Sequence, residues 1–287
     1  MRSICVVTDN TAQFTRPTFP GRNLVFTIPL HLQFLSPQER PDRELKVTDL
    51  PPSAQNGSAP RLLVPSIEDF RQEFLRLSEN YSEIVAFFIS YHLLPIINNA
   101  REAANSVRGR VNVQIIDSQT TSVGLGILVQ IAAEAATRFT SAADIERMMR
   151  GLIPHLYSVI CIPGLTYLYQ SGFTDYAQAT VGEMLGLLPI FTLEEGHLTP
   201  LEKARNLRHL TDFFQEFLDE FSDLYHVAFI QSVPAMTHES RILREHALAT
   251  FPKTPFSEHT INLSLAALFG PRCVGVIAME QAGSRQK

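Results

Sequence analysis

Two short apolar runs that each end in an aspartate constrain the fold of this chain more than any other feature. They are Val6-Val7-Thr8-Asp9-Asn10-Thr11 and Ile115-Ile116-Asp117-Ser118. Buried parallel strands read as continuous apolar runs, and open α/β sheets bind ligands at the carboxyl ends of their strands. The runs therefore predict parallel strands that end at a ligand-facing edge. We expect the polar residues that follow to organise the loops there: Asp9, Asn10, Thr11, Asp117 and Ser118.

The rest of the chain alternates strand-like and helix-like patterns, which predicts an α/β fold. We expect a mostly parallel sheet flanked by helices in residues 1–153, and a second α/β domain in residues 154–287, with a ligand cleft between the domains. Predicted strands cover residues 4–7, 24–30, 84–89, 111–116, 157–162, 226–230, 260–263 and 273–279. Predicted helices cover residues 67–77, 122–136, 142–152, 201–221 and 239–250, with Ser66, Ser122 and Ser141 as N-caps, and residues 34–61 form a long connection.

Composition excludes several classes of partner. The chain has 287 residues, of which 45% are hydrophobic, and its net charge is −5. The negative charge disfavours nucleic acid and anionic membrane surfaces as partners. The start of the chain lacks the apolar region of a signal peptide, and no apolar run is long enough for a membrane span. Cys5, Cys161 and Cys273 lie in apolar runs, as buried reduced cysteines do. These features predict a cytoplasmic protein.

Motifs for catalysis are missing from the sequence. There is no paired-histidine metal motif, no glycine-rich phosphate loop, and no Gly-x-Ser-x-Gly turn for a nucleophilic serine. An aspartyl nucleophile at Asp9 would need a second acid two residues later, where Thr11 stands. We therefore expect no metal, no cofactor and no catalytic residue, and a phosphoryl-transfer hydrolase that uses Asp9 is the weaker alternative.

The ordered set of short blocks resembles the DegV family across nearly the whole chain. The blocks are Val6-Val7-Thr8-Asp9-Asn10-Thr11, Ile28-Pro29-Leu30, Val64-Pro65-Ser66, Ile89-Ser90, Ile116-Asp117-Ser118, Ser122-x-Gly124-x-Gly126, Leu165-x-x-Leu168-x-x-Ser171-Gly172, Leu188-Pro189-Ile190, Gly196, Lys203-Ala204-Arg205 and Gly270-Pro271. The resemblance implies a two-domain bacterial protein that holds a long-chain fatty acid and presents it to a separate kinase. Such a protein is a lipid-binding subunit and not itself an enzyme.

This sequence departs from the family pattern where the resemblance places the head group of the ligand. The family's Thr-Ser-Gln before a helix is Leu62-Leu63-Val64 here, and the His before Gly-Pro is Leu268. Its Leu-Ser-Gly-Thr block becomes Leu93-Leu94-Pro95-Ile96, and the Arg of its Gly-Gly-Arg-Ile block becomes Phe173. A buried carboxylate without partners is costly. The acid is therefore held by other groups, the ligand is a neutral lipid, or this member is a protein for interaction or regulation that binds no lipid.

Candidate ligand residues follow from this comparison. Ser90, Tyr91 and His92 are the expected polar contacts at the end of a strand, and Arg205 is a possible contact for the kinase. The remaining candidates around the ligand are Leu62, Ser66, Leu94 and Leu268. The aromatic stripe of the predicted helix 201–221 has two interpretations, a protein core or the wall of an acyl tunnel: Phe213, Phe214, Phe217 and Phe221.

Overall fold

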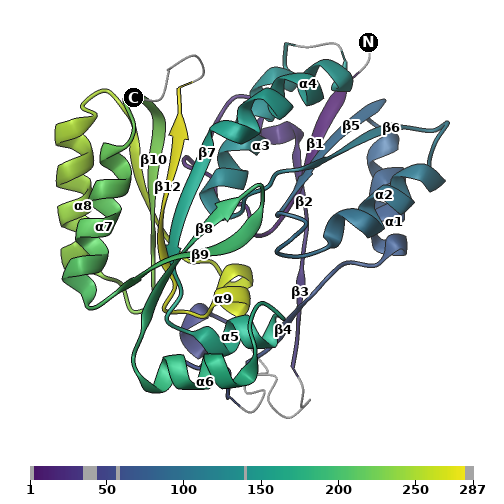
Figure 1. Ribbon diagram of the computed structural model, residues 1–287. Helices are drawn as coiled ribbons and strands as arrows, with labels where there is room; N and C mark the ends of the chain where they lie inside the picture. Colours follow the sequence, from purple (N-terminus) through teal and green to yellow (C-terminus); the bar gives the residue numbers. More distant parts are fainter. Residues whose placement is uncertain (1–2, 35–43, 56–58, 139–140, 282–287) are drawn as a thin grey trace. The chain divides into compact units, whose positions relative to one another are not determined.

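A computed structural model of the chain describes residues 3–34, 44–55, 59–138 and 141–281 (Figure 1). The chain divides into two compact units. The first comprises residues 1–31, 64–155 and 195–197, and the second comprises residues 32–63, 156–194 and 198–287. Residues 32–63 therefore group with the second unit. The division of the chain into two domains at residue 153 stays a prediction.

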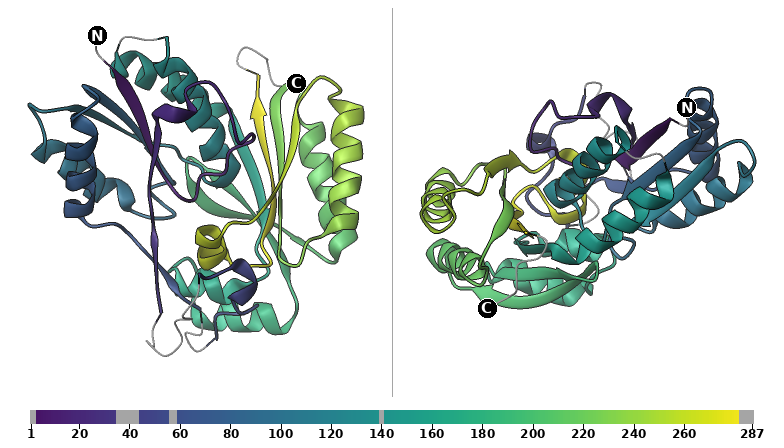
Figure 2. Two further views of the ribbon diagram at one scale, coloured as in Figure 1. Left: turned by 180° about the vertical axis from the view of Figure 1, so that it is seen from behind. Right: turned by 90° about the horizontal axis from the view of Figure 1, so that it is seen from above.

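The first unit is built on a four-stranded parallel sheet in the order β2-β1-β5-β6. Helices cover both faces, α1 and α2 on one and α3 and α4 on the other (Figures 1 and 2). The strand register brings Asp9 opposite Ile28 and Asp117 opposite Phe88, so the polar strand ends share one edge, as predicted. The elements are β1 (Ile4–Asp9), β2 (Val25–Ile28), α1 (Ile67–Ser78), β5 (Glu83–Phe88), α2 (Ile96–Ser106), β6 (Asn112–Asp117), α3 (Ser122–Ala136) and α4 (Ala142–Leu152).

Two of the three predicted helix caps are confirmed. Ser66 and Asp69 form a capping box at α1, and the Ser141 side chain accepts a hydrogen bond from Ala143 N–H at α4, which satisfies free amides of the first turn. The prediction for Ser122 is wrong. Thr121 is the N-cap of α3, while Ser122 has a φ of 55° and donates its hydroxyl to Gln13 Oε1. Within the part of the chain that the structure describes, no helix is long and apolar enough to cross a membrane.

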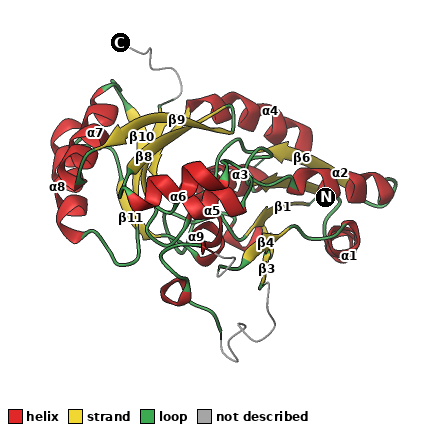
Figure 3. Ribbon diagram, turned by 60° about the horizontal axis from the view of Figure 1, so that its bottom comes forward, coloured by secondary structure: helices red, strands yellow, loops and turns green. Residues whose placement is uncertain are grey.

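The second unit contains a six-stranded mixed sheet in the order β11-β10-β12-β7-β8-β9. Strands β10 and β11 are parallel, whereas β12 runs antiparallel to both β10 and β7, and β7 runs antiparallel to β8. Helices α7 and α8 lie side by side against this sheet (Figures 1 and 2), and the short helices α5 and α6 pack on each other (Figure 3). The elements are β7 (Leu156–Cys161), α5 (Leu165–Gln170), α6 (Tyr176–Met184), β8 (Leu188–Glu194), β9 (His197–Ala204), α7 (Leu207–Asp219), β10 (Leu224–Gln231), α8 (Thr237–Thr250), β11 (Phe256–Thr260), α9 (Leu263–Phe269) and β12 (Val274–Glu280). These two sheet-containing units confirm the predicted α/β class.

Two predicted elements of this unit are wrong. Residues 197–204 form β9, which pairs with β8, so the first residues of the predicted helix 201–221 are in a strand. Helix α7 begins only after the cap residue Asn206. The predicted strand 260–263 is displaced, because β11 ends at Thr260 and α9 begins at Leu263. Much of the predicted long connection 34–61 lies outside the described residues. Its described parts include a 3-10 turn (Val47–Asp49) and the start of β4 (Arg61–Leu63), which pairs with β3 (His31–Gln33).

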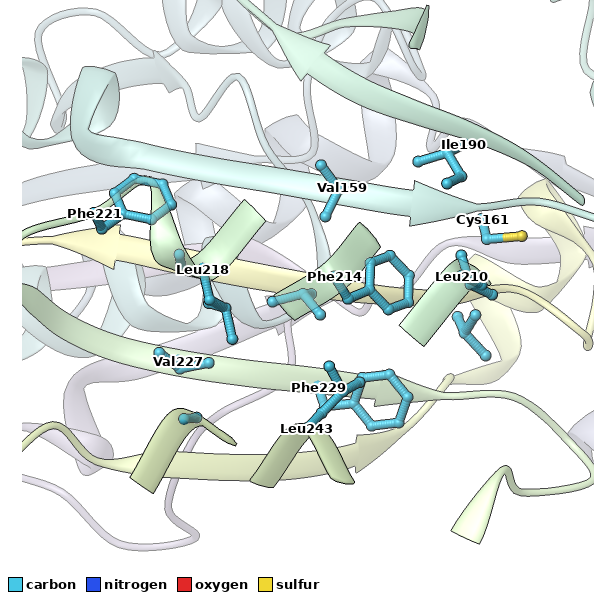
Figure 4. Close-up of a cluster of buried hydrophobic side chains, with 14 of the residues drawn as sticks. Val159, Cys161, Ile190, Leu210, Phe214, Leu218, Phe221, Val227, Phe229 and Leu243 are labelled. Atoms are coloured by element: carbon cyan, nitrogen blue, oxygen red, sulfur yellow. The ribbon is translucent and has the colours of Figure 1, made fainter. Parts of the chain in front are cut away.

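The aromatic stripe of α7 belongs to the core of the second unit (Figure 4). Phe214 and Phe221 are buried in one cluster with side chains of β7, β10 and β12, and Phe213 and Phe217 pack against that cluster. A helix that buries one apolar stripe against a sheet gains most of its stability from that contact. The stripe is therefore explained by packing between α7 and the sheet.

The three cysteines are expected to resist thiol reagents in the folded protein. All three are free and buried, and burial raises the pKa of Cys5 and of Cys161 to about 12 and raises the pKa of Cys273. Since the thiolate is the reactive form, Ellman's reagent at neutral pH should label no cysteine in the native protein and all three in guanidinium chloride. Rapid labelling of one thiol under native conditions would contradict this burial.

Candidate functional site

Asp9 connects the ends of β1 and β5 at the carboxyl edge of the parallel sheet. Its Oδ1 accepts hydrogen bonds from Thr11 N–H at 2.8 Å and from the Thr11 hydroxyl at 2.5 Å, and its Oδ2 accepts one from Ile89 N–H at 2.7 Å. Burial raises the pKa of this carboxyl, and the three hydrogen bonds oppose that rise. Asp9 is fully buried with both oxygens engaged, so it is not placed to attack a phosphoryl substrate.

The other predicted loop residues also bind the backbone near strand ends. The Asn10 side chain exchanges two hydrogen bonds with the backbone of Leu30, at 3.0 and 3.3 Å. Asp117 Oδ1 accepts hydrogen bonds from Tyr91 N–H at 3.2 Å and from Gln119 N–H at 3.1 Å, and the Ser118 hydroxyl lies 3.1 Å from the Thr120 carbonyl oxygen. These contacts fix the loops that follow β1, β5 and β6.

Ser90 follows β5 and is already engaged with the backbone. Its hydroxyl donates to the carbonyl oxygen of Gly196 at 2.7 Å, and its oxygen accepts a hydrogen bond from His92 N–H at 3.2 Å. Ser90 is fully buried, and a Cβ atom at Gly196 would lie 2.4 Å from the Ser90 Oγ. To bind a ligand oxygen, the Ser90 hydroxyl would have to release the Gly196 carbonyl.

Three rings gather beside Ser90, and one of them was not predicted from the sequence. His92 and His197 stack with ring centroids 3.4 Å apart and an angle of 24° between the rings, and Tyr91 meets His92 edge-on at 5.2 Å. All three residues are exposed. His197 starts β9 directly after Glu195 and Gly196, both of which have positive φ, as in a two-residue hairpin turn. Residues 195–197 belong to the first unit, as do Ser90, Tyr91 and His92.

The remaining candidate residues are dispersed. Leu94 is buried in the loop after β5, and Ser66 is occupied as the cap of α1. Leu62 in β4 and the buried Leu268 in α9 belong to the second unit, where these two elements pack together. Arg205 is exposed between β9 and α7, and its backbone N–H donates to His209 Nδ1 at 3.2 Å.

The described side chains do not assemble a metal centre. Across residues 3–34, 44–55, 59–138 and 141–281, no three or more His, Cys, Asp or Glu side chains converge in a way that could hold a metal ion.

Solved structures share this fold over nearly the full chain. One is a DegV family protein from Thermus thermophilus for which fatty acid binding is described, with 24% identity, a TM-score of 0.79, and coverage of 98% of this chain and 100% of the other. Another is the Fatty Acid Kinase (Fak) B3 protein from Streptococcus pneumoniae loaded with linoleic acid, with 16% identity, a TM-score of 0.79, and coverage of 97% and 100%. At these identities, the similarity shows a common fold.

Sequence comparison places the chain in a family. A DegV domain-containing protein of Deinococcus radiodurans is 26% identical over 279 residues, which are 96% of this chain and 97% of that protein. The profile of the family described as "Uncharacterised protein, DegV family" matches residues 3–281. This protein is therefore a member of the DegV family.

Proposed function

We propose that this protein binds a long-chain fatty acid and has no catalytic activity of its own. The observation that carries the proposal is the match in fold, over 98% of the chain, to the Thermus protein described as fatty acid binding. The heptadecanoic acid complex of a Eubacterium eligens DegV family protein, with a TM-score of 0.75, adds support. The buried position of Asp9 is consistent with a binding role.

The proposed ligand contacts combine a polar end with apolar lining. Tyr91 and His92 are exposed at the sheet edge where open α/β sheets bind ligands, and Ser90 lies directly before them. We propose Leu62, Leu94 and Leu268 as apolar lining. A neutral lipid is the second candidate ligand. Leu62 and Leu268 replace a Thr and a His of the family pattern, and leucine cannot hydrogen-bond a carboxylate.

We further propose that the bound acyl group is presented to a separate kinase. The fold shared with the B3 protein of a fatty acid kinase supports this role. Arg205, which is exposed, is the proposed contact for the kinase.

Native mass spectrometry of the purified protein, followed by organic extraction, tests the proposal. We expect one fatty acid per chain to co-purify, and the delipidated protein to take up added oleate in a 1:1 complex, because burial of an acyl chain contributes about 0.8 kcal/mol per methylene group. A stoichiometric neutral lipid would replace the proposed ligand class. Protein that is isolated empty and also refuses oleate would contradict lipid binding.

A further inference from the structure

A small cavity opens at the amino end of β6, at the edge of the sheet opposite to the candidate site. Its volume is about 310 Å³, and it is lined by Ala104 in the last turn of α2 and by residues 108–113. Helix α2 packs against β6, which is an edge strand of the parallel sheet (Figure 1). Since a strand rises about 3.3 Å per residue, Asn112 lies about 17 Å from Asp117 at the carboxyl end of β6. The cavity is therefore separate from the residues proposed to contact a lipid.

Two arginines give this cavity its charge. Arg108 and Arg110 flank Gly109, whose φ of 96° turns the chain from α2 toward β6. Both arginines are exposed, and among the residues that the structure describes neither guanidinium takes part in an ion pair or a side-chain hydrogen bond. None of the described residues that line the cavity carries a carboxylate. Two permanent positive charges therefore border the cavity without a counter-charge in its wall.

The end of α2 does not account for these charges. Cations are favourable at a helix C-terminus because the last carbonyl groups carry partial negative charge, about half a charge in total. Backbone amides already bind carbonyl groups at this end of α2. Arg108 N–H donates to the Asn105 carbonyl at 3.4 Å. The Val107 carbonyl accepts from Arg110 N–H at 3.1 Å and from Val111 N–H at 3.5 Å. Two guanidinium groups exceed the charge of the helix end, so the cavity keeps a positive excess.

The open edge of β6 adds a backbone donor to the same cavity. Asn112 N–H donates to the Ser82 carbonyl at 3.2 Å, directly before β5. In a parallel strand the N–H groups of successive residues point to opposite sides, so the N–H of Val113 points away from β5. No strand pairs with β6 on that side among the described residues, and Val113 lines the cavity. The cavity thus combines two charged donors with a backbone N–H.

We propose that this cavity binds a small ligand through a phosphate group, with Arg108 and Arg110 on its oxygens and Val113 N–H as a third donor. Guanidinium groups match phosphate oxygens with pairs of parallel hydrogen bonds. A volume of about 310 Å³ is at the lower end for small-molecule sites, which favours inorganic phosphate or a small phosphate monoester. The inference is independent of lipid binding, because it uses none of the proposed lipid contacts.

Titration with inorganic phosphate, followed by amide NMR spectra of the full chain, tests this site. We expect saturable shifts of the Gly109, Arg110 and Val113 amide signals with a Kd of about 1 mM. The affinity should fall as sodium chloride is added, because salt screens exposed charges. Acetate carries a single charge and should bind about tenfold more weakly. Methyl phosphate is titrated in parallel, and the tighter of the two phosphates shows whether the site prefers the free anion or a monoester.

Single substitutions assign the binding to the two arginines. Arg108→Gln and Arg110→Gln should each weaken phosphate binding about tenfold, whereas Arg110→Lys keeps the charge without the planar fork and should weaken it about threefold. Arg147→Gln is the matched control, because it also removes one positive charge from the first unit. Arg147 is exposed on α4 and pairs with Asp144 at 3.3 Å, so this variant should bind phosphate as the wild-type protein does.

Three results would overturn the proposal. Phosphate shifts that spread over the surface without saturation would show that the cavity holds no specific anion. Equal losses in Arg147→Gln and Arg108→Gln would show that only the overall charge of the protein matters. Binding of poly-glutamate at Arg108 and Arg110, with no binding of either phosphate, would assign the arginines to an acidic protein surface instead of a small ligand.

Discussion

Replacing Gly126 with alanine is expected to lower the free energy of unfolding by about 3 kcal/mol, at the upper end of overpacking effects. Gly126 lies within α3, where alanine normally stabilises a helix by up to about 1 kcal/mol. Here, however, an added Cβ atom would clash with the backbone of Gln13. It would lie 1.9 Å from the Gln13 carbonyl oxygen and 2.5 Å from the carbonyl carbon. Backbone atoms cannot rotate away as a side chain can, so α3 and the loop after β1 would have to separate.

Gly151→Ala provides the matched control. Gly151 lies within α4 of the same unit, and a Cβ atom added there would meet nothing within 4 Å. This substitution should therefore stabilise the protein by roughly 0.5–1 kcal/mol through helix propensity alone. Urea unfolding followed by circular dichroism measures both variants. A Gly126→Ala protein as stable as Gly151→Ala would show that the close approach of α3 to Gln13 is absent.

The sequence was sufficient to predict the parallel strands of the first unit and its helices α1, α3 and α4, although not α2, because the signals for these elements are local. An apolar run that stops at Asp9 or Asp117 marks both a buried strand and its carboxyl end, and the parallel order then sets these ends along one edge. The capping box of Ser66 marks the start of α1. In such positions the pattern, the cap and the packing all favour one structure.

The hairpin of the second unit shows why periodicity alone fails. Residues 201–221 have a helical pattern, but the turn at Glu195 and Gly196 allows β9 to complete an edge of the sheet through pairing with β8. Strand pairing depends on partners that a local pattern does not contain. Asn206, a good N-cap, was the available signal that the helix begins later.

The candidate site was predictable only in part for the same reason. Ser90, Tyr91 and His92 follow directly from the end of β5, so the sequence places them at the sheet edge. Their contacts with Gly196 and His197 join residues about a hundred positions apart. The Glu195-Gly196 pair is a sequence signal for a hairpin turn, which predicts that His197 starts a strand. That signal does not predict that His197 lies beside His92.

Asp9→Asn is expected to lower the free energy of unfolding by about 1–3 kcal/mol, the usual range when a buried hydrogen-bonding group is left without its partner. Both carboxylate oxygens of Asp9 accept hydrogen bonds, from Thr11 on one side and from Ile89 N–H on the other. An asparagine offers one acceptor oxygen and one donor amide group. In either orientation its NH2 group therefore faces another donor inside a fully buried position.

Asp117→Asn makes the same chemical change at the same sheet edge with a different expected result. Asp117 uses a single oxygen, Oδ1, to accept from Tyr91 N–H and Gln119 N–H, so an asparagine oxygen can keep both hydrogen bonds. We expect its free energy of unfolding to change by less than about 1 kcal/mol. Chemical denaturation of both variants measures the difference. If the two substitutions destabilised the protein equally, the use of both Asp9 oxygens could not be what holds the ends of β1 and β5 together.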